Sequence, residues 1–486
     1  MNSIKTLTAL IALVVHVQQA TAQQPWSMQQ CMQYAVEHNH GVRQARLDLD
    51  NDEATRIAAV GRFLPDVDAV VAVQYNFGRA IDPKTNTYTD VSTFYNVYSL
   101  QASLPVFDGF SRLHALKAAK ASELMGRQAL RCQQDQTAIA VLQAYVQVAY
   151  SEGLVKMAEE KQQETELLLR QTLLMEEVGR KSAADVAMME SQKAEADYEL
   201  TRQRHLFDSA LLQLKMDMAY PMDEELRVSE AVFAHVADST ATRHDALPSP
   251  FHPILQQAYS QMQTSKHEWR QARASFYPTL SLSAGLNTTY YHTLHAHDLS
   301  SFGSQFRNNM GEYVGATLSV PLFNRLQTLT SVRRAKNNYR KACEAYEQKQ
   351  MELEKLCRET LHDWQGFLQQ AEQMAKKVEA DSLAHRLTQR QYEEGLCTAI
   401  DLRTTSAQLL QSKATLLQCR LMAIVKEQLL RYYHGQAIWN SKSSPAVNVF
   451  VKPNERNDAC IDSAMARKGR MKSNEFDMIR RYGQNH

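Results

Sequence analysis

The stretch Leu104-Pro105-Val106-Phe107-Asp108 returns later in the chain as Val320-Pro321-Leu322-Phe323-Asn324, with its proline 216 residues further on. A second pair keeps the same spacing, because Gly179 and Gly395 also lie 216 residues apart. Motifs that repeat at one fixed offset indicate a tandem duplication. The chain of 486 residues is therefore predicted to be one unit made of two similar halves, although its length alone would suggest about three domains.

Each half contains two segments whose side chains alternate between apolar and polar, which is the period of a β-strand. The segments cover about 66–77 and 95–106 in the first half and about 279–287 and 313–322 in the second. Segments of roughly ten residues with this alternation are typical of outer-membrane barrel strands. The half-buried sheet of a soluble protein is the alternative that the alternation alone leaves open.

A long run without proline follows each pair of segments and predicts a very long helix. Residues 109–178 and 325–394 form the two runs, each about 105 Å long if fully helical. Each run ends at a glycine and a polar turn, after which a shorter helix returns over 185–219 or 401–435. Apolar residues recur at seven-residue steps on the returning helices, the pattern of a coiled coil. Each half is thus predicted to form a long antiparallel coiled-coil hairpin.

The N-terminus has the features of a secretory signal, with a cation at Lys5, an apolar stretch and the cleavage pattern Ala20-Thr21-Ala22. No continuous apolar stretch of about 18 residues follows, so no transmembrane helix is expected. The predicted organisation is a signal peptide over 1–22, a first repeat over 23–219, an inter-repeat linker over 220–249, a second repeat over 250–435 and a flexible tail over 436–486.

Charge and composition exclude several classes of function. Lys and Arg number 54 against 53 Asp and Glu, so the basic excess that a nucleic-acid binder needs is lacking. We find no nucleophile beside a base, no phosphate loop and no paired acids in a plausible cleft. The protein is therefore not expected to be an enzyme, and no cofactor or metal ion is expected.

Four strands per chain cannot close a barrel, because about eight is the smallest number that does. An open sheet edge cannot sit in lipid, so other copies of the chain must complete the sheet. Three copies supply twelve strands, enough for a channel. A ring of long hairpins attached to one end of such a barrel would form a hollow tube, and the object as a whole would be a conduit.

The repeated order of strand, loop, strand and long helix resembles that of the TolC-like outer membrane efflux protein family. The opening Trp26-Ser27-Met28-Gln29-Gln30-Cys31 and the segment from Ala272 to Pro278 resemble the family's motifs, and the turns at 178–186 and 392–402 resemble its periplasmic tips. The resemblance covers about 26–435. It implies an α+β membrane protein that assembles as a homotrimer with a 12-stranded β-barrel and an α-helical periplasmic tunnel.

The resemblance also implies a function and partners. The chain would be the outer membrane exit duct of a tripartite efflux or type I secretion system and would conduct substrates passively. A periplasmic adaptor protein and an inner-membrane pump would be its partners, and outer membrane lipid would surround the barrel. The alternative is a periplasmic coiled-coil adaptor, an interaction protein, which would have one helical hairpin between compact β modules rather than two hairpins.

The tip turns are the candidate site. Gly179 and Gly395 interrupt the long helices, and we expect them where a Cβ does not fit. By position, Asp185, Tyr392 and Asp401 match the residues that hold the family's aperture closed, whereas Cys397 and Thr404 replace two of the family's charged residues. The alternative is that both acids only cap helices. The residues expected to form the tip turn and to dock the adaptor are Gly179, Ser182, Asp185, Val186, Gly395, Thr398, Asp401 and Leu402.

Overall fold

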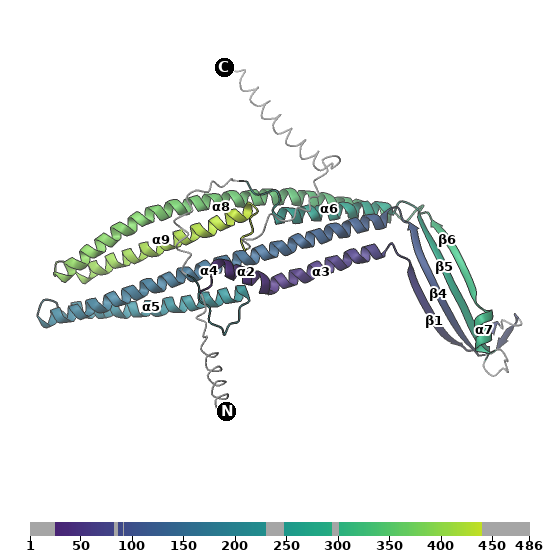
Figure 1. Ribbon diagram of the computed structural model, residues 1–486, viewed down its shortest axis with the longest axis horizontal. Helices are drawn as coiled ribbons and strands as arrows, with labels where there is room; N and C mark the ends of the chain where they lie inside the picture. The colour runs from purple at the N-terminus through teal and green to yellow at the C-terminus, as the bar shows by residue number, and fades with distance from the viewer. Residues whose placement is uncertain (1–24, 82–85, 91, 230–246, 294–300, 440–486) are drawn as a thin grey trace, which may run out of the picture. The chain divides into compact units, whose positions relative to one another are not determined.

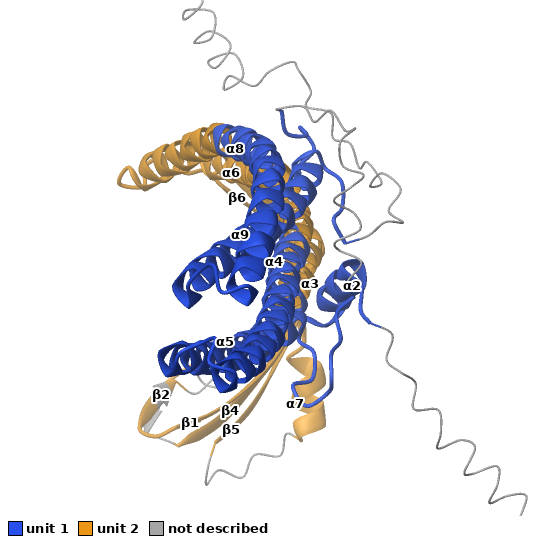
Figure 2. Ribbon diagram, turned by 90° about the vertical axis from the view of Figure 1, so that its left-hand side faces the viewer, with its two compact units in different colours: residues 1–43, 132–252, 350–486 blue, residues 44–131, 253–349 orange. Residues whose placement is uncertain are grey.

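A computed structural model describes residues 25–81, 86–90, 92–229, 247–293 and 301–439. The chain divides into two compact units (Figure 2): unit 1 comprises 1–43, 132–252 and 350–486, and unit 2 comprises 44–131 and 253–349. The predicted signal peptide at 1–22 lies outside the described residues, as do 230–246 of the predicted linker and 440–486 of the predicted tail.

Unit 2 contains an antiparallel sheet in the order β1-β4-β5-β6 (Figure 1). Its strands are β1 (Asp66–Asn76), β4 (Thr93–Phe107), β5 (Thr279–Thr293) and β6 (Gly311–Ser319). A separate short ribbon pairs β2 (Arg79–Ile81) with β3 (Tyr88–Asp90). Strands of the two halves therefore lie next to each other in one sheet, because β4 of the first half pairs with β5 of the second.

The register of the sheet separates an apolar face from a polar one. Leu282 lies opposite Leu104 on one side and Ala316 on the other. The next residue, Ser283, lies opposite Ser103 and Gly315. Since successive side chains point to opposite faces, the sheet carries one face of Leu, Ala and Val and one of Ser, Gly and Thr.

Strand β5 is longer than the predicted segment of about 279–287, since it continues to Thr293, and a short helix, α7 (Phe302–Asn308), precedes β6. The extension pairs with β4, where Thr288 lies opposite Tyr98 and Thr293 opposite Thr93. Side-chain contacts complete its other edge beyond the end of β6. The side-chain amide of Gln305 accepts a hydrogen bond from the Tyr291 backbone N at 3.0 Å and donates one to the Tyr291 carbonyl at 2.9 Å. The Thr288 hydroxyl donates to the Phe306 carbonyl at 2.7 Å.

Two helices of 67 residues, α4 (Ser111–Glu177) and α8 (Gln327–Glu393), begin in unit 2 and end in unit 1. Each is followed by a return helix, α5 (Ala183–Met218) or α9 (Ala399–Tyr433). Helix α3 (His40–Gly61) leads into the first strand of the first half, and helix α6 (Pro253–Ala274) leads into the first strand of the second half. Within unit 1, α5 runs back along α4, and α9 runs back along α8 (Figure 1).

The main core of unit 1 surrounds Tyr145 in the middle of α4. Tyr145 is fully buried, and its hydroxyl lies 3.1 Å from the Trp26 carbonyl and 3.0 Å from the Ser229 carbonyl. Helix α2 (Met28–His38) packs here, and it begins at a capping box formed by Ser27. The core joins segments from both halves, and its fully or nearly fully buried members include Met32, Ala35, Leu142, Val148, Leu214, Met218 and Leu421.

Helix α4 is, by length and composition, apolar enough over an 18-residue window to cross a membrane, although the sequence led us to expect no such helix. Half of that window, 50%, is buried inside the protein. Because α4 supplies Val141, Leu142 and Tyr145 to the core of unit 1, packing accounts for part of its apolar character.

The first four residues of the predicted tail, 436–439, belong to the described part of the chain. Ile438 is buried and Trp439 packs against the core of unit 1. The indole N–H of Trp439 also donates to the Asp135 carboxylate at 3.2 Å. Residues 436–439 are therefore part of the folded unit, because an apolar pair there finds a place in the core.

Candidate functional site

The two tip turns, one between α4 and α5 and one between α8 and α9, have the same backbone geometry. Gly179 has a φ of +73° and Gly395 a φ of +81°. After each glycine, a backbone N–H reaches the carbonyl five residues back: Arg180 donates to Met175 at 2.8 Å, and Leu396 donates to Gln391 at 2.7 Å. This is the Schellman arrangement, in which a left-handed residue closes the end of a helix.

The requirement for glycine comes from this backbone conformation and not from crowding. A Cβ placed on Gly179 or Gly395 would have no atom within 4 Å. The expectation that a Cβ would not fit at these two positions is therefore wrong, because space is available there. The left-handed region is unfavourable for residues with a Cβ, and most of all for β-branched ones.

Replacing Gly395 with valine is expected to destabilise the tip by about 1–3 kcal/mol, because valine would hold a left-handed conformation. Export should fall, while the amount of assembled protein in the membrane should change little. Gly366→Val is the matched control, since Gly366 lies within α8, has no positive φ, and also has open space around its Cβ. Limited proteolysis at the tip together with an export assay measures both effects. Equal behaviour of the two variants would contradict the conformational argument.

Each return helix begins with a capping box that includes one of the two predicted aspartates, Asp185 or Asp401. The Asp185 carboxylate accepts from the Ser182 backbone N at 3.0 Å, and the Asp401 carboxylate accepts from the Thr398 backbone N at 3.0 Å. Hydrogen bonds from Ser182 lower the pKa of Asp185, and hydrogen bonds from Thr398 lower the pKa of Asp401. Within one chain, both carboxylates therefore act as helix caps, as the alternative in the sequence analysis stated.

Tyr392 lies in the interior of the tip and contacts the other hairpin. Only 2% of it is exposed, and its hydroxyl lies 3.1 Å from the Thr172 hydroxyl on α4. The Lys181 ammonium lies 3.9 Å from the centre of the Tyr392 ring, which is a cation–π contact. Burial raises the pKa of Tyr392 against the opposing hydrogen bond from Thr172. Tyr392 thus joins the two hairpins through Thr172, and its partner in the chain is a hydroxyl rather than a carboxylate.

Two of the residues expected to dock a partner are instead buried. Val186 is 8% exposed and Leu402 is 1% exposed. Leu402 belongs to a small core that holds the four helices together at the tip; its buried members are Leu168, Met189, Tyr392, Ala399 and Leu402. This burial argues against direct contact of Val186 or Leu402 with a partner and gives both a packing role.

The surface of the tip exposes apolar side chains that sequence reasoning missed. Val178 is 71% exposed, Leu396 is 73% exposed and Ile400 is 60% exposed. Val178 precedes one turn glycine and Leu396 follows the other, so their place beside a helix-ending glycine was the signal that could have identified them.

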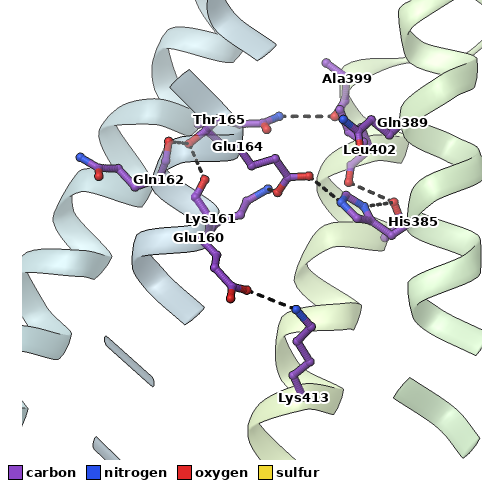
Figure 3. Close-up of polar contacts among 12 residues, drawn as sticks. Glu160, Lys161, Gln162, Glu164, Thr165, His385, Gln389, Ala399, Leu402 and Lys413 are labelled. Carbon is purple, nitrogen blue, oxygen red and sulfur yellow. Dashed lines mark hydrogen bonds and ion pairs between the residues drawn. The ribbon is translucent and has the colours of Figure 1, made fainter. Parts of the chain in front are cut away.

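A second set of polar contacts joins the hairpins further along the helices (Figure 3). His385 on α8 is 8% exposed, and its Nε2 lies 2.6 Å from a Glu164 carboxylate oxygen on α4. The Lys161 ammonium donates to the other Glu164 oxygen at 3.0 Å. Burial opposes ionisation of Glu164, but the bond to His385 and the charge of Lys161 outweigh it and lower the pKa of Glu164 to about 2. Glu164 is therefore a carboxylate at neutral pH.

Two weaker contacts accompany this pair. Lys413 on α9 lies 3.4 Å from a Glu160 oxygen on α4, and the Gln192 amide on α5 donates to the Ala399 carbonyl at 3.4 Å. No local pattern marks Glu164 or His385, because the two residues lie 221 positions apart and meet only in the folded protein. Like the bond from Tyr392 to Thr172, these are non-covalent contacts between two hairpins, so the arrangement can hold the hairpins together reversibly but performs no covalent chemistry.

The profile of the outer membrane efflux protein family matches residues 31–216 and again residues 251–436. The chain belongs to the outer membrane efflux protein family. Members of this family are outer membrane channel proteins, so the chain is an outer membrane exit duct, and the alternative of a periplasmic adaptor is wrong. The two matches fall on the two halves that the repeated motifs define.

Relatives within the efflux family include proteins named for secretion and for efflux. The chain is 24% identical over 388 residues to the alkaline protease secretion protein AprF of Pseudomonas aeruginosa, which covers 74% of this chain and 75% of AprF. It is 23% identical over 431 residues to the probable efflux pump outer membrane protein TtgC of Pseudomonas putida, with 84% of each chain covered.

Solved structures of outer membrane channels share the fold of this efflux family member. CusC matches with a TM-score of 0.72 and 16% identity over 84% of this chain and 92% of CusC. CmeC of Campylobacter jejuni matches with a TM-score of 0.71 and 13% identity over 87% of this chain and 88% of CmeC. These matches support a mostly helical channel protein with a small sheet.

Proposed function

We propose that this efflux family member works as a homotrimer whose three sheets close into a 12-stranded barrel and whose hairpins form the periplasmic tunnel. The observation that carries the proposal is the sheet of unit 2, which has four strands and two open edges, at β1 and β6. Such edges cannot face lipid, and three copies supply twelve strands. We further propose that the mature chain begins at Gln23 after removal of the signal peptide.

The proposed partners are a periplasmic adaptor and an inner-membrane pump. The names of TtgC and AprF assign those relatives to an efflux pump and to protein secretion, and either kind of system would suit this chain. The exposed tip residues Val178, Leu396 and Ile400 offer apolar side chains to a helical partner. The turn residues Gly179, Gly395, Ser182 and Thr398 hold them in place.

The proposed gate is the ring that three copies of the tip would form. Asp185 and Asp401 would appear three times each around the opening and would concentrate negative potential there. Tyr392 would support the ring from inside through Thr172 and Lys181. Opening would require the two hairpins of each chain to separate, which breaks the contacts between them.

The double change Asp185→Ala and Asp401→Ala is expected to raise single-channel conductance and to weaken cation preference in planar bilayers. The matched control is Ser182→Ala with Thr398→Ala, which removes the partner in each capping box but keeps both charges. If the acids line the opening, only the first variant changes cation preference. If both variants change conductance equally, the acids act as helix caps alone.

The channel itself is tested with the wild-type protein. Purified in detergent, it should have the mass of a trimer, and after reconstitution it should conduct ions without an energy source. A monomer, or a trimer that does not conduct, would overturn the proposal.

A further inference from the structure

An exposed apolar belt lies where the strands of unit 2 meet its helices. Each segment that joins the sheet to α3, α4, α6 or α8 exposes at least one large apolar side chain, and the most exposed are Leu322 at 92% and Phe323 at 79%. The other aromatic ones are Phe63, Phe110, Phe276 and Tyr277, between 41% and 59% exposed. Aromatic side chains at strand ends are typical of the level where hydrocarbon gives way to headgroups.

Basic side chains follow the belt within the adjoining turns of the helices. Lys117 and Lys120 lie near the start of α4, Arg270 and Arg273 near the end of α6, and Arg333 and Arg334 near the start of α8. All six are exposed. We call these six residues the collar.

Acidic residues are almost missing from the same turns. Residues 111–120 of α4 and 327–341 of α8 contain no Asp or Glu. In α6, whose C-terminal end lies at the sheet, Arg273 belongs to the last turn, where the helix dipole favours a cation. The sequence therefore accumulates positive charge where α4 and α8 leave the sheet, with no acid in the same turns to balance it.

The collar is not neutralised from within the described part of the chain. None of its six residues forms an ion pair there, whereas Arg127, further along α4, pairs with Glu123 at 2.7 Å. Arg273 lies 5.7 Å from the centre of the Trp269 ring, a contact that leaves its charge uncompensated. The positive potential is also felt by His267: burial first, and Arg270 second, lower the pKa of His267 to about 4.

We propose that the collar binds the phosphate groups of anionic phospholipids in the periplasmic leaflet of the outer membrane. The order along the segments that join the sheet to α4, α6 and α8 is an apolar strand face, an apolar belt and then unpaired cations, which is the order of layers in an anionic bilayer surface. A solvated basic face would not need the belt beside it. This inference rests on the placement of the sheet in the membrane, and it goes beyond conduction because it concerns the lipid that holds the protein.

The test compares two double variants on the same helix. Arg333→Glu with Arg334→Glu changes the collar, and Arg386→Glu with Arg390→Glu makes the same charge change at exposed positions near the other end of α8. Native mass spectrometry of the detergent-solubilised protein measures retained phosphatidylglycerol and phosphatidylcholine. A basic residue near an anionic surface is worth roughly fivefold in affinity, so the collar variant should bind phosphatidylglycerol at least about tenfold more weakly.

The control variant should keep wild-type binding of phosphatidylglycerol, and neither variant should alter binding of phosphatidylcholine. Arg333→Gln with Arg334→Gln, which avoids new negative charge, should show a smaller loss in the same direction if the double Glu variant fails to assemble. Unchanged phosphatidylglycerol binding in an assembled collar variant, or an equal loss in the control, would overturn the inference. Conductance of the wild-type trimer is measured separately, so failure of the lipid proposal leaves the channel proposal standing.

Discussion

Leu282→Arg is expected to destabilise the membrane-inserted protein by about 2–4 kcal/mol, the cost of an arginine on the lipid face of a barrel near mid-bilayer. Leu282 is 42% exposed in the single chain and sits between Leu104 and Ala316 on the apolar face of the sheet. No charged partner lies opposite it on either neighbouring strand. The charge would therefore meet hydrocarbon, and the amount of trimer that survives mild denaturation should fall sharply.

Ser283→Arg is the matched control, one residue further along β5. Ser283 lies between Ser103 and Gly315 on the polar face, which a closed barrel turns toward its water-filled interior. Urea titration of the reconstituted protein, followed by gel mobility of the trimer, compares the two variants. Equal losses would show that the strand faces have been assigned to the wrong environments.

Glu164→Gln is expected to weaken the 2.6 Å contact with His385 between the hairpins, because it removes the negative charge, and so to favour the open tip. The pKa of Glu164 falls from an ordinary 4.5 to about 2, which corresponds to a stabilisation of at most about 3 kcal/mol. This is a ceiling for the contact between the hairpins, because 25% of the Glu164 side chain is exposed to solvent and because part of the shift comes from Lys161 on the same helix. Higher conductance in planar bilayers at neutral pH is the expected readout. Glu166→Gln is the control, since among the described residues Glu166 forms its ion pair with Arg170 on its own helix.

The same pair predicts an acid dependence with a definite sign. A carboxyl group with a depressed pKa in the folded state stabilises that state above its unfolded value and loses this contribution as the pH falls. The contact should therefore be intact above about pH 4.5 and should weaken between about pH 4.5 and pH 2. Wild-type conductance should rise over that window, whereas Glu164→Gln should already be high and change less. A wild-type channel whose conductance is flat over that range would contradict the role of Glu164.

The long helices and the strands could be predicted from sequence periodicity because their signals are local. The run without proline before Gly179 and the alternation around Leu282 each lie within one element, so neither needs a tertiary contact to be read. The contacts that join the hairpins had no such signal. Tyr392 and Thr172 lie 220 positions apart, so the contact between their hydroxyls depends on how the four helices pack.

The resemblance to the efflux family identified the correct turns but did not predict the contacts within them. Asp185 and Asp401 lie three residues after Ser182 and Thr398, a spacing that predicts a capping box directly. The capping-box spacing predicts the observed hydrogen bonds of both aspartates, whereas the resemblance placed both aspartates with Tyr392 in a closing network. Val186 and Leu402 each begin the seven-residue apolar pattern of their return helix, a local signal of burial that the expected docking role did not take into account.

Gln305 has a consequence for how the sheet can grow. Its side-chain amide offers Tyr291 one acceptor and one donor, as the peptide group of a neighbouring strand would. The edge of β5 at that row is thereby occupied, so on that side of the sheet an incoming strand can add only along the nine residues of β6. Gln305 thus limits where a further strand can pair on that side of the sheet. Because only one stretch of backbone is left for pairing there, strands of neighbouring subunits are kept from joining in a shifted register.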